Sequence, residues 1–226
     1  MSRKIEVVDY NPEWKKLFKI EAKKIKNVLG KNCVEIHHIG STSVKGLKAK
    51  PVIDIMTVVK DINLVDEQKT EFQELGYECL GENGIKGRRF YTKVDDNPTH
   101  HIHILEKGNK ADIERHLAVR DYLRNHADVA RKYAELKVQL ADKFTYDNNG
   151  YCDGKDAFVK NLEKKALKWK KQEEYQGECI ALGMCFGVGI GSALGTMFSN
   201  LSMGMCLGIS IGMCLGLVVG SMKNKE

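Results

Sequence analysis

Hydrophobic and polar residues alternate in different ways along this chain of 226 residues. Apolar residues recur every three or four positions between Asn11 and Gly30, which predicts an amphipathic helix opened by Asn-Pro and closed by Gly. The stretches 33–39 and 51–59 are short and largely apolar, as is typical of strands, and the second is apolar enough to be a central strand buried on both faces. Further strands are expected at 5–9, 77–80, 88–94 and 100–106, and a further helix at 61–75.

Helical spacing dominates the sequence after Gly108. Helices are expected at about 111–125, 128–144 and 156–171. Taken together, the elements predict an α+β fold, with a mixed β-sheet, flanking helices and a helical second half. We expect this domain to occupy residues 1–170.

The last part of the chain has a composition of its own. No charged residue and no histidine occurs from Cys179 to Met222, and glycine recurs every fourth residue in two runs, at 183–195 and 204–220. The segments 179–198 and 201–222 are each long enough to span the ~30 Å hydrocarbon core of a bilayer. The sequence therefore predicts a linker at 171–178, a two-helix transmembrane hairpin with a turn at Ser199-Asn200, and a tail at 223–226. Glycine stripes of this kind let helices pack closely in lipid, so they would also allow a homo-oligomer.

Charge predicts how the hairpin is oriented. Six lysines lie between 160 and 171, two more follow the second segment, and the turn between the segments has none. The positive-inside rule then gives a two-pass protein of the cell membrane with both termini in the cytoplasm. A glycine-rich soluble helix pair and an interfacial helix are the alternatives, although the latter would need a charged face that the segments lack. The net charge of +6 is accounted for by the flanking lysines, so no nucleic-acid partner is favoured.

One loop and the strand after it carry the candidate chemistry. Gly40 and Ser41 follow a predicted strand, where a glycine lets the backbone approach a ligand closely and a short helix would direct N–H groups at a phosphate. Asp54 lies on the next strand and could hold a divalent cation that neutralises the phosphate. A simple turn with a buried, hydrogen-bonded Asp is the competing interpretation.

Several blocks of this sequence resemble the GrpB family. They are His38-Ile-Gly-Ser-Thr-Ser-Val44, Lys50-Pro-Val-Ile-Asp-Ile55, Thr99-His-His-Ile-His-Ile104, His116 to Arg124, Val8 to Trp14 and Tyr133 to Lys137. The resemblance covers roughly residues 4–170 and implies a nucleotidyltransferase-like fold of the DNA polymerase beta superfamily type. It also implies a Gly-Ser pair, two carboxylates two residues apart on a strand, and a third acid on a neighbouring strand. Asp54 matches the first carboxylate, but the second position is Met56, whose thioether cannot bridge two Mg²⁺ ions.

Other residues are candidates to complete the site. His101 and His103 share one face of their strand and would approach Asp54 if the two strands are neighbours, which would give a metal site of these three residues with Mg²⁺ as the expected divalent ion. Hydrogen-bonded, partly buried histidines are the alternative. Asp54 and Ser41 are the candidate catalytic residues, and the candidates for binding phosphate or nucleotide are Gly40, Ser41, Ser43, Lys50 and Arg89. Glu106 and Asp95 are candidates for the third acid, and Arg120, Asp121 and Arg124 form either a structural brace or part of a ligand site.

Three functions follow from these features. The first is a membrane-anchored, metal-dependent nucleotidyl- or phosphotransferase-like enzyme acting on a nucleotide or another phosphorylated small molecule. The second is a degenerate module that binds such a ligand without turning it over, as Met56 suggests. The third is an oligomerising membrane hairpin that carries the domain as cargo. The sequence favours the first narrowly over the second.

Overall fold

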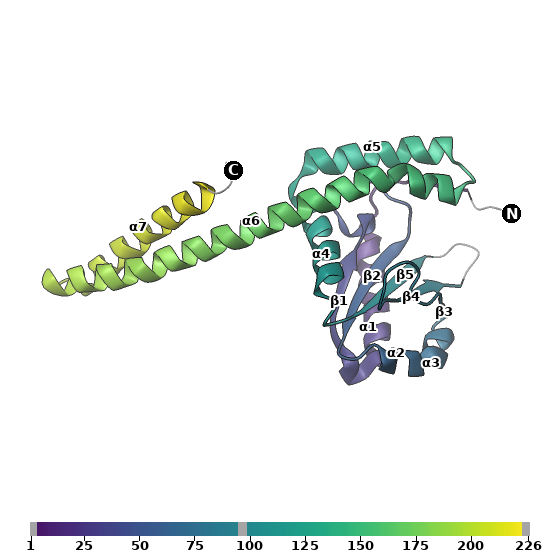
Figure 1. Ribbon diagram of the computed structural model, residues 1–226, viewed down its shortest axis with the longest axis horizontal. Coiled ribbons are helices and arrows are strands. Elements are labelled where there is room, and N and C mark those ends of the chain that lie inside the picture. The colour runs from purple at the N-terminus through teal and green to yellow at the C-terminus, as the bar shows by residue number, and fades with distance from the viewer. Residues whose placement is uncertain (1–3, 95–98, 223–226) are drawn as a thin grey trace. The chain divides into compact units, whose positions relative to one another are not determined.

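We describe a computed structural model that covers residues 4–94 and 99–222. It divides into two compact units, Met1–Ala166 and Leu167–Glu226, which are treated separately here. The first unit contains the sheet and most of the helices (Figure 1). Its strands are β1 Cys33–Ile39, β2 Ile53–Val59, β3 Tyr77–Cys79, β4 Arg89–Lys93 and β5 His100–Glu106. Its helices are α1 Glu13–Leu29, α2 Asn63–Glu67, α3 Lys69–Glu74, α4 Lys110–Asn125, α5 Ala127–Lys143 and the first part of α6.

The five strands form one mixed sheet in the order β1-β2-β5-β4-β3. β2 and β5 are parallel, and the other neighbours are antiparallel. The register places Asp54 opposite His101 and Met56 opposite His103. Both expectations about β2 are therefore confirmed, because it is an inner strand and the histidine strand is its neighbour.

Helices cover the two faces of the sheet differently. On one face, Ile55 and Ile102 share a core with Trp14 of α1 and with Phe72 of α3. On the other face, Met56 packs with Ile39 and Leu105 against α4. Side chains alternate between the faces along each strand, so Asp54, His101 and His103 lie on the α4 face. The candidate site is thus at the polar end of the face that α4 covers.

The helical second half is confirmed, with one difference in how it is divided. Helix α6 runs from Asn148 to Met197 without a break, so it begins before the expected position 156 and includes the residues 171–178 that were expected to be a linker. The α6 start is fixed by Asp147, whose Oδ1 accepts hydrogen bonds from the backbone N–H groups of Asn149 and Gly150. Within the first unit, Tyr133 of α5 stacks on Phe158 of α6, with ring centroids 5.2 Å apart.

Three short segments differ from what the pattern predicts. Residues 5–9 form only an isolated bridge between Val8 and Ala49, because no neighbouring strand extends beside them. The expected helix at 61–75 is divided into α2 and α3 at Gln68, whose side-chain amide donates to the carbonyl of Val28 instead of facing solvent. After Gly40, only a three-residue 3₁₀ turn, Ser41–Ser43, forms. A turn of this length does not supply the helix N-terminus that the sequence suggested for phosphate binding.

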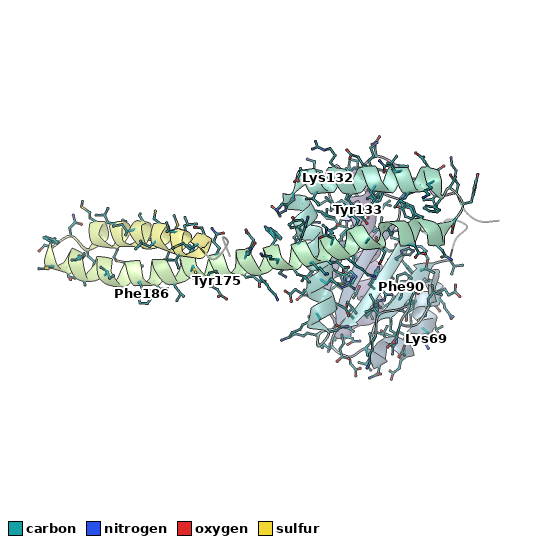
Figure 2. The ribbon with its side chains drawn as sticks, turned by 45° about the horizontal axis from the view of Figure 1, so that its top comes forward. Lys69, Phe90, Lys132, Tyr133, Tyr175 and Phe186 are labelled. Atoms are coloured by element: carbon teal, nitrogen blue, oxygen red, sulfur yellow. The ribbon has the colours of Figure 1, made fainter. Side chains whose placement is uncertain are left out.

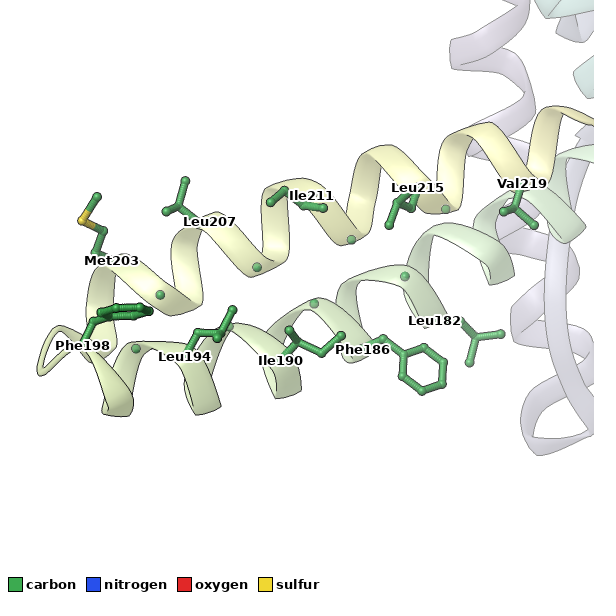
Figure 3. Close-up of a pocket in the computed structure, with 18 of the residues that line it drawn as sticks. Leu182, Phe186, Ile190, Leu194, Phe198, Met203, Leu207, Ile211, Leu215 and Val219 are labelled. Atoms are coloured by element: carbon green, nitrogen blue, oxygen red, sulfur yellow. The ribbon is translucent and has the colours of Figure 1, made fainter.

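The second unit is built around a seam of glycines between α6 and α7, Leu201–Met222. A methyl group added at Gly187 would overlap the backbone carbonyl of Gly208, and the pairs Gly183–Gly212 and Gly191–Gly204 are equally close. Larger apolar side chains such as Phe186 and Ile211 flank the seam and are exposed (Figure 3). Both helices are long and apolar enough to cross a membrane. The two stripes therefore pack against each other within one chain, and a homo-oligomer formed through them would have to replace these contacts.

Candidate functional site

A cavity of about 910 Å³ opens beside the Gly40-Ser41 loop in the first unit. Its walls come from the loop, from β2 and β5, from α5, and from the start of α6. The polar residues that matter below are Ser41, Lys50, Asp54, His101, Lys137, Asp147 and Lys155. The structure therefore brings together residues that lie more than a hundred positions apart in the sequence.

Gly40 allows the loop to lie directly against Asp54. Its φ is +68°, a left-handed conformation that favours glycine, and a Cβ placed there would overlap the Asp54 carboxylate. The sequence predicted a close backbone approach at this glycine. In the structure, the group approached is the Asp54 side chain, which closes the loop onto the sheet.

Two histidines hold the Asp54 carboxylate. His101 Nδ1 lies 3.3 Å and His103 Nε2 lies 3.7 Å from Asp54 Oδ1, and the Asp54 side chain is 28% exposed. Burial by itself would raise the pKa of this carboxyl, but the neighbouring imidazoles of His101 and His103 outweigh it and hold the pKa below its ordinary value. Asp54 is therefore ionised at neutral pH, and two side chains of β5 contact its carboxylate.

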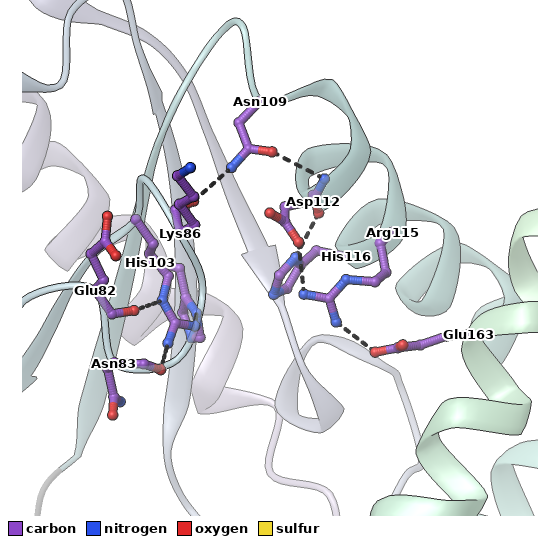
Figure 4. Close-up of polar contacts among 10 residues, drawn as sticks. Glu82, Asn83, Lys86, His103, Asn109, Asp112, Arg115, His116 and Glu163 are labelled. Carbon is purple, nitrogen blue, oxygen red and sulfur yellow. Dashed lines mark hydrogen bonds and ion pairs between the residues drawn. The ribbon is translucent and has the colours of Figure 1, made fainter.

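The orientation of His103 is set by residues that the sequence did not single out. Arg88 is buried, and its guanidinium lies 3.1 Å from His103 Nδ1. Since a guanidinium can only donate, Nδ1 must accept, so the proton of the neutral ring is on Nε2, which faces Asp54. Arg88 is itself anchored by the carbonyls of Glu82 and Asn83 (Figure 4).

Helix α4 adds a second layer of polar contacts behind His103 (Figure 4). The His116 ring lies near it at a tilt of 60°, with ring centroids 5.5 Å apart, and its Nδ1 donates to the carbonyl of Asp112. Burial lowers the pKa of His116 to about 4, so it is neutral at physiological pH. Arg115 bridges Asp112 and Glu163 at 3.1 and 2.6 Å, which fixes this part of α4 to α6.

Lys137 is the other important residue that sequence reasoning missed. It lies on α5 and is only 3% exposed, and its Nζ is 2.9 Å from Ser41 Oγ and 2.5 Å from the carbonyl of Lys48. Burial and the charge of Lys155 lower the pKa of Lys137 to about 7, against a smaller opposing effect of Asp54. Its only signal in the sequence was its place in the Tyr133–Lys137 block, which predicts a helix and not a site.

Comparison with known proteins agrees with this fold. The family model described as GrpB protein matches residues 4–165, which is most of the chain. The chain belongs to the GrpB family. A second family model, described as a glycine zipper membrane protein, matches residues 173–222. The two halves of the sequence thus correspond to a GrpB domain and a membrane-associated glycine zipper.

Several relatives resemble the GrpB domain alone. UPF0157 protein YqkA of Bacillus subtilis is 45% identical over 169 residues, which are 75% of this chain and 49% of YqkA, so this chain spans about half the length of that relative. Glutamate-rich protein GrpB of Alkalihalophilus pseudofirmus is 32% identical over 69% of this chain and 92% of its own. The crystal structure of the conserved protein GrpB from Enterococcus faecalis aligns with a TM-score of 0.71 and 44% identity, covering 73% of this chain and 99% of that one. The mixed sheet with its flanking helices is therefore the fold of the GrpB family.

Not every predicted site residue of the GrpB domain reaches the cavity. Arg89 lies on the opposite face of the sheet, where its Nε and Nη2 both donate to the Asp66 carboxylate at 2.7 Å. Arg89 therefore does not line this cavity, and its predicted role in phosphate binding stays a prediction; Arg88, just before β4, lies on the site face. Ser43 donates from Oγ to the carbonyl of Gly40 and lines a separate hollow over β1, whereas Lys50 lines the cavity with Nζ 3.2 Å from Asn148 Oδ1.

The side chains present do not fit a protein-held Mg²⁺. Magnesium requires near-octahedral oxygen ligands, whereas Asp54 offers one carboxylate beside two imidazoles, one of which hydrogen-bonds to it. Met56, two residues after Asp54 on the same face of β2, offers no oxygen and is fully buried in the apolar cluster under α4. Across residues 4–94 and 99–222, no group of three or more His, Cys, Asp or Glu side chains is placed to hold a metal ion. Asp54, His101 and His103 thus lie together as a polar cluster, and a divalent cation bound there stays a prediction.

The candidates for a further acid are also placed elsewhere. Glu106 Oε2 accepts from the backbone N–H of Ile62 at the far end of β5 from the cavity, and Asp95 lies outside the described residues. Asp147 lines the same cavity as Asp54, although its Oδ1 is engaged at the start of α6. A second carboxylate near Asp54 therefore comes from the helical half and not from the sheet.

The sequence left two roles open for Arg120, Asp121 and Arg124 of α4, a structural brace or part of a ligand site. Their contacts in the structure are those of a brace. Arg120 contacts both oxygens of Asp121 at 2.7 and 2.9 Å, and Arg124 donates to the carbonyl of Ser43 at 2.9 Å. Arg124 thereby ties α4 to the loop that carries Ser41. These contacts position the loop from the side opposite the cavity.

Proposed function

We propose that this protein is a membrane-anchored GrpB domain that binds a phosphorylated small molecule, a nucleotide being the expected class, in the cavity beside Ser41. The observation that carries the proposal is the cationic part of the wall of that cavity, which Lys50 and Lys155 form beside the Ser41 loop. The Asp54 carboxylate on the same cavity already contacts the imidazoles of His101 and His103, at 3.3 and 3.7 Å. The cavity therefore presents the ammonium groups of Lys50 and Lys155 to an anionic ligand.

The positions of the lysines support phosphate over a simple carboxylate. Lys50 approaches from the loop and Lys155 from α6, where its Nζ lies 4.9 Å from the centroid of the Tyr151 ring. Cations that converge from different elements suit a ligand with several charged oxygens, such as a di- or triphosphate. The cavity volume of about 910 Å³ lies within the range of pockets that enclose drug-sized ligands.

The test is equilibrium binding to the full chain in detergent micelles. The ligands are ATP, GTP, CTP, UTP and pyrophosphate, and the variants are Lys50→Gln and Lys155→Gln. The control is Lys132→Gln, which changes an exposed lysine of α5 on the outside of the domain (Figure 2). We expect each cavity variant to weaken pyrophosphate about tenfold, because a hydrogen bond to a charged group contributes ~1.5 kcal/mol and 1.4 kcal/mol is a factor of ten. Equal affinities of the Lys50→Gln and Lys132→Gln variants would contradict the proposal.

A metal-dependent transferase is the second candidate function. It is favoured by the ionised state of Asp54 and by the presence of Asp147 on the same cavity. The test is product formation from the four nucleotides by the full chain with Mg²⁺, Mn²⁺ or Zn²⁺. Turnover lost in both Asp54→Asn and Ser41→Ala would support this function, whereas tight binding without turnover supports a binding module.

We also propose that the hairpin crosses the membrane twice, with both chain termini in the cytoplasm. The apolar exposed surface of α6 and α7 and the lysines that flank it support this topology. The test uses a chain whose other cysteines are replaced by serine and that carries either Ser199→Cys or Asn224→Cys. A membrane-impermeant maleimide should label residue 199 in intact cells and residue 224 only after permeabilisation. The reverse pattern, or labelling of both from outside, would contradict the topology.

A further inference from the structure

Lys137 is a buried lysine without a counter-ion. Only 3% of it is exposed, and no carboxylate of the described residues forms an ion pair with it. Its nearest polar groups are instead the Ser41 hydroxyl and the carbonyl of Lys48. Burying an ammonium without such compensation is costly, so the site favours the neutral amine.

The groups around Nζ suit a neutral amine. An –NH₂ group has two hydrogens and one lone pair, and Nζ has three neighbours that match them. The carbonyl of Lys48 accepts one hydrogen, and the ring of Tyr133, whose centroid is 4.5 Å away, lies in reach of the other. The lone pair is then left for the hydroxyl proton of Ser41, with Oγ 2.9 Å away. The pKa of Lys137, lowered to about 7 by burial and by the charge of Lys155 and only partly restored by Asp54, agrees with this state.

We propose that Ser41 and Lys137 form a nucleophile–base pair that attacks an acyl group in the cavity. The hydroxyl of Ser41 is held on the cavity wall, and Lys137 is fixed behind it by the backbone of the same loop. An amine in hydrogen-bond reach of a serine hydroxyl is the arrangement that activates serine in Ser-Lys catalysis. Neither Asp54 nor a metal ion takes part in this step.

The step proceeds in two halves. Ser41 Oγ attacks the acyl carbon and forms an O–C bond while its proton passes to Lys137 Nζ. The bond from the acyl carbon to the leaving oxygen then breaks, and Lys137 returns the proton to that oxygen. Water hydrolyses the acyl-serine ester by the same route and releases a carboxylic acid, so only the substrate and water are consumed.

The substrate class follows from the rest of the cavity, and this part of the inference rests on the proposed function. Lys50 and Lys155 would bind a phosphate group of the substrate. The expected substrate is therefore an activated acyl compound that carries a phosphate, with its carbonyl at Ser41. The reactivity of the pair itself does not depend on phosphate binding, so the two can be tested apart.

The test is covalent labelling of the full chain in detergent micelles with an alkyl fluorophosphonate. In the expected reaction Ser41 Oγ bonds to phosphorus, fluoride leaves, and Lys137 takes the hydroxyl proton. Intact mass and peptide mapping should show a single adduct on Ser41 that is absent in Ser41→Ala. The Lys137→Met variant should label at least a hundredfold more slowly, since a general base contributes at least that factor. The matched control is Lys132→Met, which removes an exposed lysine of the same helix and should label like the wild type.

The outcomes separate this inference from the proposed function. The Ser41–Lys137 pair is overturned by any of three results: no labelling of Ser41, an adduct on another serine, or an unchanged labelling rate in Lys137→Met. Pyrophosphate binding, measured on the same samples, shows separately whether phosphate recognition is present. If Ser41 is labelled but pyrophosphate does not bind, the Ser41–Lys137 pair is supported and the proposal that its substrate carries a phosphate is refuted. If Lys137→Met does not fold, as its thermal unfolding would show, the comparison of wild type with Ser41→Ala decides the question.

Discussion

Adding one methyl group at Gly40 should measure how tightly the Ser41 loop is closed onto Asp54. In Gly40→Ala the new Cβ would lie 3.0 Å from Asp54 Cγ and 3.1 Å from its Cβ, besides overlapping the carboxylate. The φ of +68° adds a backbone cost of about 1–2 kcal/mol, because an L-residue is disfavoured in the left-handed region. Overpacking of this kind adds about 1–3 kcal/mol. We therefore expect a loss of about 2–5 kcal/mol, which for a domain of this size lowers Tm by roughly 5–15 °C.

The matched control is Gly46→Ala in the same loop. Gly46 has a φ of +80°, but a Cβ there would meet nothing within 4 Å, so only the backbone cost applies. The assay is thermal unfolding of the full chain in micelles, followed by the fluorescence of Trp14, which is 4% exposed, in a Trp169→Phe background. Gly40→Ala should unfold at a lower temperature than Gly46→Ala, and Ser41 labelling by the fluorophosphonate should fall with it. Equal Tm values for the two variants would refute the close contact between Gly40 and Asp54.

Three further predictions follow from other contacts. Burial lowers the pKa of His38 and of His100 to about 4, so the folded domain keeps them neutral while the unfolded chain binds protons near pH 6.5. Each of them contributes on the order of 1–3 kcal/mol to the free energy of unfolding, and this contribution is complete above pH 6.5 and is lost as the pH falls toward 4. The free energy of unfolding measured in urea should therefore be lower at pH 5 than at pH 7.5, and equal values would contradict the burial. Gly187→Ile should separate α6 from α7, measured as a longer distance between spin labels on the two helices, whereas Gly189→Ile should not, because a Cβ at Gly189 meets nothing within 4 Å. Arg89→Gln should lower the free energy of unfolding by about 1 kcal/mol, because the Asp66 carboxylate loses its partner, and it should leave pyrophosphate affinity unchanged. Weaker pyrophosphate binding would show that Arg89 contributes to the binding site.

The local pattern of apolar, polar and turn residues was sufficient to predict most of the secondary structure. The strands at 33–39 and 100–106 have the predicted bounds, and the helix of α1 ends at Gly30 as expected, because periodicity and turn residues act over a few neighbouring positions. The pattern was less reliable where a distant contact intervenes. Gln68 interrupts the predicted helix at 61–75 because its side chain reaches the carbonyl of Val28, which no local pattern records.

The candidate site was predictable in part. The proximity of His101 and His103 to Asp54 followed from their alternation and from the assumption that two strands are neighbours, which the sheet confirms. The choice between Arg88 and Arg89 could not be made in this way. Alternation says that adjacent residues face opposite sides of a sheet, but it does not say which side holds the site.

What the sequence determined by itself was the order of the elements, the α+β class and the two apolar glycine-rich helices, since each depends on spacing within one segment. Only the tertiary structure decided which residues of different segments contact one another. Lys137 reaches Ser41 across 96 positions of sequence, and α4 buries Met56 two residues from Asp54. The two glycine runs likewise face each other in one hairpin, because the turn at Ser199-Asn200 folds α7 back along α6. Burial, charge and chain reversal act between residues that are distant in sequence, so they are fixed only when the fold is complete.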